Sequence, residues 1–208
     1  MVLLSGVIDS EVKSSAIGLI MMVNQTLSDV ADEYIEKCID LIISHKNSRI
    51  VVMGAGRSGL VGKAFALRLL HLGYEVHVLG ETLMPPVMED NLVIAISGSG
   101  TTKLVITAVE AAKNVGAKII AITSYPESQL GRLADFVLKV KGRVIPTEGV
   151  DKRDYFARQI LGIHEPLAPL GTLFEDTCML LLDAIVIVMM DRLKLNEDWL
   201  KKRHANIE

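Results

Sequence analysis

The chain has 208 residues, half of them hydrophobic but only 4% aromatic, and a chain of this length buries about 70% of its unfolded surface on folding. This composition excludes a disordered chain and a small disulfide scaffold, and it predicts a core of aliphatic side chains. The net charge of −3, with no basic run longer than residues 201–203, excludes the electrostatic footprint of a general nucleic-acid binder.

The predicted elements begin with two helices within residues 7–46, where apolar residues recur at helical spacing. The spacing breaks near residues 24–28, where Asn, Thr and Ser can cap a second helix. Short apolar segments rich in β-branched residues follow, and most of them are separated by helical patterns. The expected strands are 49–53, 75–79, 92–96, 118–122 and 136–140, and the expected helices are 60–72, 102–114, 127–133 and 172 to about 194.

This alternation predicts the fold class. Strands that are apolar on both faces are typical of a parallel sheet that is covered on both sides. We therefore expect an α/β protein, a three-layer α/β/α sandwich with a five-stranded parallel sheet and right-handed crossovers. One domain is expected to span residues 1–208, with N-terminal helices at about 7–46, a turn-rich segment after Lys141, and a C-terminal helix and tail at about 172–208.

The cysteines and the apolar runs indicate the compartment. Cys38 and Cys178 form no CxxC motif, so neither a zinc site nor a disulfide framework is expected, and a reducing cytoplasm is the default. The longest apolar run, 178–190, contains Asp183 and is shorter than the roughly 18 to 20 residues of a membrane span. We assign the high mean hydropathy of +0.38 to subunit contacts and expect a homo-oligomer, a dimer or tetramer. Asp183 is expected to make a structural pair or to face a subunit interface.

Two glycine-rich turns follow predicted strands. The first, GAGRSG at 54–59, matches the GxGxxG pattern between a strand and a helix. Alone it suggests a dinucleotide site, with Glu81 as the acid that binds the ribose. Arg57 and Ser58 lie in this turn and are candidate substrate contacts, although Arg57 could instead be a structural ion-pair partner.

The second turn, SGSGTT at 97–102, has the chemistry of a phosphate site. Small residues let the backbone approach an anion, amides at a helix N-terminus point towards it, and the hydroxyls of Ser97, Ser99 and Thr102 add donors. A P-loop lysine after the last glycine is missing, which disfavours nucleoside triphosphates. The alternative is a tight turn with capping residues. Both turns should face one crevice at the carboxyl ends of the strands.

Residues 97–102 resemble the phosphosugar loop of the sugar isomerase (SIS) domain family. Taken with GAGRSG at 54–59, GET at 80–82, PLGTLFE at 169–175 and the ending RHANIE at 203–208, they resemble the 6-phospho-3-hexuloisomerases of that family. The likeness covers nearly the whole chain in the expected order. One departure is Thr101, where family members commonly have Glu.

The resemblance implies interconversion of D-arabino-hex-3-ulose 6-phosphate and D-fructose 6-phosphate through an enediol, as in the ribulose monophosphate pathway. It implies a phosphorylated ketohexose as substrate, no metal, no redox cofactor, no nucleic-acid or membrane partner, and functional coupling to a 3-hexulose-6-phosphate synthase. Ser97, Ser99 and Thr102 would hold the phosphate, while Arg57 and Ser58 would contact the sugar.

Enediol chemistry needs a base beside the carbon and a carrier for the oxygen protons. Glu175 is the candidate base, near the start of a long apolar helix, where desolvation would raise its pKa and the helix dipole would lower it. The competing interpretation is a carboxylate that only caps the helix.

His204 is the candidate carrier of oxygen protons, because imidazole titrates near neutrality. Related SIS domains bring a histidine into the site from a neighbouring subunit, although a histidine near a charged terminus can simply be solvated. The other histidines have ordinary structural explanations: His45, His71, His77 and His164.

Two functions of other classes remain open. A non-catalytic phosphosugar sensor would keep the second turn without needing Glu175 or His204. An NAD-dependent oxidoreductase would use the first turn, but it would leave the second turn and the C-terminal ending unexplained.

Overall fold

The computed structural model describes residues 3–142 and 171–204. The turn-rich segment expected after Lys141, the first residues of the PLGTLFE motif, His164 and the last four residues of the ending lie outside the described residues. In the described part of the chain, no helix has the length and apolar character needed to cross a membrane.

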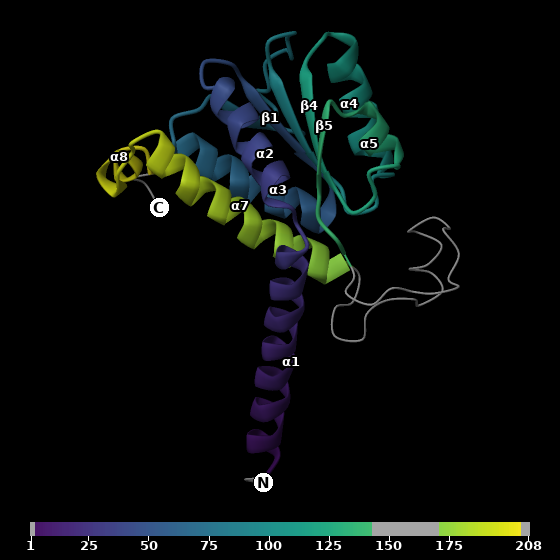
Figure 1. The fold of residues 1–208 in the computed structure, drawn as a ribbon, viewed down its shortest axis with the longest axis vertical. Coiled ribbons are helices and arrows are strands. Elements are labelled where there is room, and N and C mark those ends of the chain that lie inside the picture. Colours follow the sequence, from purple (N-terminus) through teal and green to yellow (C-terminus); the bar gives the residue numbers. More distant parts are fainter. Residues whose placement is uncertain (1–2, 143–170, 205–208) are drawn as a thin grey trace.

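Five parallel strands form one sheet (Figure 1), which confirms the expected sheet, and their order is β2-β1-β3-β4-β5. Gly54 pairs with Ile96, and Ile96 pairs with Ile122, so the carboxyl ends of the three central strands are aligned. The chain passes from β1 to one side and from β3 to the other, which makes the gap between them the switch point where ligands of such sheets bind. The strands are β1 (Ile50–Gly54), β2 (Val76–Val78), β3 (Leu92–Ile96), β4 (Lys118–Thr123) and β5 (Phe136–Lys139).

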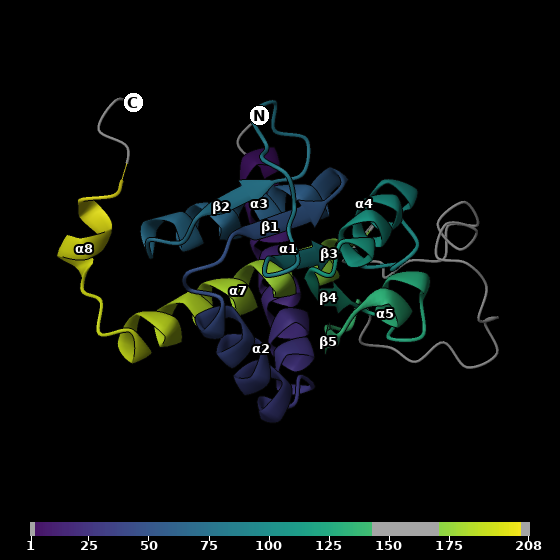
Figure 2. The same cartoon turned by 90° about the horizontal axis from the view of Figure 1, so that it is seen from above.

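Helices cover both faces of the sheet (Figure 2). One layer contains α2 (Asp32–Ser44), α3 (Gly56–His71) and α7 (Thr172–Arg192), and the other contains α4 (Lys103–Asn114) and α5 (Gln129–Leu133). Alternate strand residues belong to different clusters, because successive side chains of a strand point to opposite faces. Val52, Ile94 and Ile120 pack with the first layer, and Val51, Val93 and Ile119 with the second. The expected three layers are confirmed.

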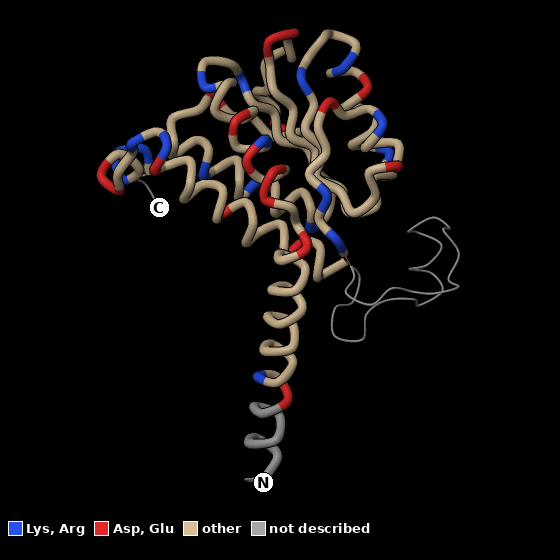
Figure 3. The backbone as a smooth tube through the Cα atoms, viewed as in Figure 1, with Lys and Arg blue, Asp and Glu red and all other residues tan. Residues whose placement is uncertain are grey.

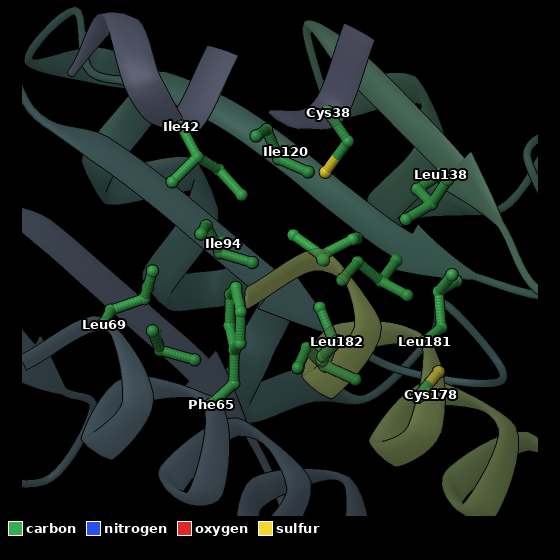
Figure 4. Close-up of a cluster of buried hydrophobic side chains, with 14 of the residues drawn as sticks. Cys38, Ile42, Phe65, Leu69, Ile94, Ile120, Leu138, Cys178, Leu181 and Leu182 are labelled. Atoms are coloured by element: carbon green, nitrogen blue, oxygen red, sulfur yellow. The ribbon is translucent and has the colours of Figure 1, made fainter. Parts of the chain in front are cut away.

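The core beneath α2, α3 and α7 is largely aliphatic (Figure 4). Ile94 and Ile120 from the sheet lie near Ile42 of α2 and are at most 1% exposed, and burying such a side chain stabilises the fold by roughly 1.5–3 kcal/mol. Cys38 and Cys178 belong to the same core as free, buried thiols. Burial raises the pKa of Cys38 to about 12.

The two expected N-terminal helices are present, but the break between them lies at 29–31 and not near 24–28. The first helix, α1 (Leu3–Ser28), runs through the expected break and extends away from the sheet (Figure 1). The polar residues expected to cap a second helix instead bond back within α1: Thr26 Oγ1 donates to the carbonyl of Met22, and Ser28 Oγ donates to that of Asn24. The second helix therefore begins only after Ala31, its N-cap.

One further helix boundary was wrong, and one helix was not predicted. Helix α3 begins at Gly56, four residues before the expected start, because glycines 56 and 59 are poor helix formers and hid its first turn from the apolar pattern. A short helix, α8 (Glu197–Lys201), forms in the expected tail, where Asn196 Oδ1 caps it by accepting a 3.0 Å hydrogen bond from Trp199 N.

Candidate active site

The first glycine turn joins β1 tightly to α3. A Cβ added to Gly54 would lie 2.9 Å from the Cα of Gly59, so the close approach of the two backbones requires glycine. This contact gives the GxGxxG pattern a packing role and places Arg57 and the half-buried Ser58 in the first turn of α3. Glu81, the candidate ribose acid, instead lies 2.9 Å from Nδ1 of His77.

The second turn is held by its own hydroxyls. Ser97 Oγ lies 3.0 Å from Thr102 Oγ1 and accepts a 3.2 Å hydrogen bond from Gly100 N. Ser99 Oγ accepts hydrogen bonds of 3.2 Å from both the amide and the hydroxyl of Thr101. Thr101, the departure from the family pattern, is thus part of the loop's internal network.

The start of α4 leaves amide donors beside this loop. Thr102 is the N-cap residue of α4, but its side chain does not cap the helix and bonds to Ser97 instead. The first amides of a helix have no partner within it and lie at the positive end of its dipole. Hydroxyls and amides together can therefore receive a phosphate group.

Glu175 lies in the first turn of α7 and is paired with Arg57. Arg57 Nε donates to Glu175 Oε2 over 2.5 Å, and its Nη2 lies 3.3 Å from Asp176 Oδ1. The Glu175 side chain is only 12% exposed, and this burial raises its pKa although the Arg57 charge and hydrogen bond pull it down. Arg57 therefore does make the ion pair that was the alternative to substrate contact, and its partner is the candidate base.

Only the tertiary structure shows that two of the candidate residues, Arg57 and Glu175, are paired. Arg57 is brought to Glu175 and Asp176 at one end of α7, and Phe174 brings that end into contact with Gly98 of the second turn. Sequence reasoning missed Asp176 and Phe174. The signal for Asp176 was the adjacent carboxylate, whereas a buried Phe next to a candidate base reads simply as core.

His204 lies elsewhere within one chain. Its ring centroid is 5.2 Å from that of His71, the last residue of α3, whereas Arg57 is in the first turn of the same helix. The rise of an α-helix puts these two ends roughly 20 Å apart. The structure therefore does not bring His204 to Glu175 of its own chain.

Asp183, the carboxylate within the apolar run of α7, has a structural partner. Asp183 is half exposed and lies 3.5 Å from Arg68, which fits the expected structural pair between α7 and α3. Within residues 3–142 and 171–204, no three His, Cys, Asp or Glu side chains gather as metal ligands.

The sequence model of the protein family described as "SIS domain" matches residues 42–147 of the chain. The chain belongs to the SIS domain family. A Bacillus subtilis relative of this SIS protein, named 3-hexulose-6-phosphate isomerase, is 36% identical over 86% of the chain and 89% of its own length. A Methylomonas aminofaciens relative with the same name is 33% identical over 91% of the chain and 96% of its own length.

A solved structure agrees with this assignment. A hypothetical protein from Methanococcus jannaschii, for which a molecular function of 3-hexulose-6-phosphate isomerase was inferred, has a TM-score of 0.73 and 32% identity to the SIS protein. The match covers 95% of this chain and 99% of that one. The resemblance drawn from the motifs is confirmed, and the named relatives support an isomerase activity.

Proposed function

We propose that this SIS protein works as one domain and interconverts D-arabino-hex-3-ulose 6-phosphate and D-fructose 6-phosphate. The observation that carries the proposal is the nearly buried Glu175 carboxylate, which has a raised pKa and is paired with Arg57 at the switch point of the sheet. Because its pKa is raised, the ionised form of this carboxylate is a stronger base than an exposed one.

The substrate phosphate binds at the second turn. Ser97, Ser99 and Thr102 supply hydroxyls, and the first amides of α4 supply the positive end of a helix dipole. Such a site recognises the phosphate by geometry and charge, and it leaves the sugar chain to extend towards the first turn. Arg57 and Ser58 contact the sugar there.

The reaction moves one hydrogen between adjacent carbons. Glu175 removes the proton from carbon 2 of the 3-ulose, the electron pair forms the enediolate, and Glu175 returns the proton to carbon 3. The guanidinium of Arg57, 2.5 Å from the carboxylate, stabilises the negative charge that develops on the sugar oxygens. Binding of the sugar exchanges part of the Arg57–Glu175 ion pair for contacts between Arg57 and substrate oxygens.

A second copy of the chain supplies His204 to handle the oxygen protons. Exposed apolar residues on α1 support a homo-oligomer: Ile17, Ile20 and Met21 are 58%, 67% and 68% exposed at helical spacing. Beyond Lys13, α1 carries no charged side chain up to its end at Ser28 (Figure 3). Contiguous apolar surface of this kind marks an interaction site. A solution mass of two or four chains is the expected result, and a mass of one chain would overturn this part of the proposal.

The partner in metabolism is a 3-hexulose-6-phosphate synthase, which makes the 3-ulose. No metal or redox cofactor takes part in the proposed reaction. A reducing cytoplasm, expected from the two free thiols, remains a prediction.

A coupled assay tests the activity. A 3-hexulose-6-phosphate synthase generates the 3-ulose, and the SIS protein is expected to convert it to fructose 6-phosphate, which a coupling enzyme detects. A protein that binds fructose 6-phosphate in a thermal-shift titration but produces none would be a phosphosugar sensor. Stabilisation by NAD but not by fructose 6-phosphate would instead favour the oxidoreductase.

A further inference from the structure

The two glycines of the phosphate loop are constrained to different degrees. Gly100 has a φ of +64°, a conformation that side-chain-bearing residues rarely adopt, and a Cβ there would also overlap the Ser128 side chain. Gly98 does not have a positive φ, so its backbone conformation would tolerate another residue. It lacks space instead, because a Cβ at this position would lie 3.0 Å from Cδ1 and 3.2 Å from Cγ of Phe174.

The ring of Phe174 therefore fills the place that a side chain at position 98 would take. Phe174 is 3% exposed and directly precedes Glu175 in the first turn of α7. A second glycine also lies near Phe174, since a Cβ at Gly142 would be 3.5 Å from the Cβ of Phe174. The start of α7 is thus in contact with the phosphate loop through the Phe174 side chain.

The loop side of this contact is fixed to the sheet. The carbonyl of Gly98 accepts hydrogen bonds from Ser124 N (3.2 Å) and Thr123 Oγ1 (3.4 Å), both at the end of β4. The carbonyl of Gly100 accepts one from Leu130 N (3.0 Å) at the start of α5. A loop anchored in this way does not follow a change in Phe174, so the change must be taken up by α7, which carries Glu175.

We propose that Phe174 is a positioning residue for the isomerisation, setting the separation between the phosphate loop and the Glu175 carboxylate by contact with Gly98. The inference rests on the proposed function, because it concerns the distance from the substrate phosphate to the base. A displacement of about 1 Å at a reacting group can cost on the order of 10²-fold in rate. The contact acts on geometry, and Phe174 itself touches no reacting atom.

The first test is Phe174→Leu. We expect kcat to fall by about tenfold or more, with KM within about threefold of wild type because the loop keeps its own hydrogen bonds. The matched control is Phe136→Leu, which makes the same change in the same core cluster but on β5, where the ring stacks on Tyr34. The control should lose stability and keep its kcat.

The second test approaches the contact from the loop. Gly98→Ala leaves every core side chain intact, and it should lower kcat because the added methyl group pushes the ring of Phe174 away. In the double variant Gly98→Ala/Phe174→Leu, the smaller side chain makes room for the methyl group. The losses of the two single variants should therefore not add, and kcat should recover to near the value of Phe174→Leu alone. A purely structural role of Phe174 would not produce this recovery in kcat.

The outcomes separate the two proposals. A wild-type protein that does not isomerise the 3-ulose overturns the proposed function and the inference with it. An active wild type with kcat of Phe174→Leu within about twofold, or with losses that simply add in the double variant, overturns only the positioning role. If Phe174→Leu does not fold, Phe174→Met replaces it, because the longer, unbranched Met side chain adapts to the space left by the ring.

Discussion

Arg57 and Glu175 lie 118 positions apart in the sequence, yet the Nε of Arg57 is 2.5 Å from Oε2 of Glu175. The pair joins the first turn of α3 to the first turn of α7, and Arg57 remains 55% exposed while Glu175 is 12% exposed. Burial and the Arg57 charge therefore act in opposite directions on the same carboxyl group, and burial has the larger effect on its pKa.

Replacing Arg57 should change the pH dependence of the reaction. The acidic limb of kcat/KM follows Glu175, because only the ionised carboxylate can accept the proton. Arg57 lowers the pKa of Glu175, so Arg57→Met should raise that pKa and move the acidic limb to higher pH. Arg57→Lys keeps the charge and should move it less. Limbs at the same pH in all three proteins would show that Glu175 is not the titrating base.

The two serines of the phosphate loop should behave differently. Ser97 is 3% exposed and bonds to Thr102 and to the amide of Gly100, so Ser97→Ala should cost about 1 kcal/mol of folding stability as well as affinity. Ser99 is less buried and its hydrogen bonds to Thr101 are exposed to water, so Ser99→Ala should raise the Kd of fructose 6-phosphate by about fivefold while leaving Tm almost unchanged. Calorimetric titration and thermal unfolding measure both quantities. An unchanged Kd in both variants would show that the hydroxyls of this loop do not bind the sugar phosphate.

Acid should destabilise the protein in part through His71. Burial, then the nearby His204 and Arg68, lower the pKa of His71 in the folded state. In the unfolded chain His71 has its ordinary pKa of about 6.5, so between that value and the lower folded pKa the unfolded state binds more protons than the folded state. The free energy of unfolding therefore falls as the pH drops through about 6.5 towards the folded pKa. Urea unfolding at pH 7.5 and pH 5.5 should show a smaller loss for His71→Gln than for wild type. Equal losses would contradict this role.

Both thiols should be inert in the folded protein. Burial raises the pKa of Cys38 to about 12, and burial together with the charge of Glu175 raises that of Cys178 well above its ordinary value. Since the thiolate is the reactive form, a thiol reagent should label neither residue in native buffer and both in concentrated urea. Rapid labelling of Cys178 under native conditions would mean that the start of α7 opens readily.

Local patterns were enough to predict the sheet. Each of the five expected strands overlaps an observed one, because short apolar segments bounded by glycine or polar residues usually form buried strands in a chain of this composition. The phosphate loop was equally visible, since its chemistry lies in consecutive residues. The start of α3 was missed because its first turn holds two glycines: Gly56 has a φ of +56°, and Gly59 lies against the backbone of Gly54.

The remaining parts of the site depend on tertiary packing. Nothing near Arg57 in the sequence indicates a partner on α7, and Gly98 reads as a loop glycine until Phe174 is seen against it. The position of His204 beside His71 likewise depends on α8, a helix of five residues that Asn196 caps. Periodicity and spacing do not report such long-range contacts.

Hydrogen exchange on the sugar tests the central claim most directly. Fructose 6-phosphate is incubated with the protein in D2O, and the proton NMR signal of the hydrogen on carbon 3 is followed over time. The wild type should replace that hydrogen with deuterium, Glu175→Gln should do so on the order of 10²-fold more slowly, and Glu33→Gln, which changes an exposed carboxylate on α2, should match the wild type. No exchange by the wild type, or exchange by Glu175→Gln within a few-fold of it, would contradict the account.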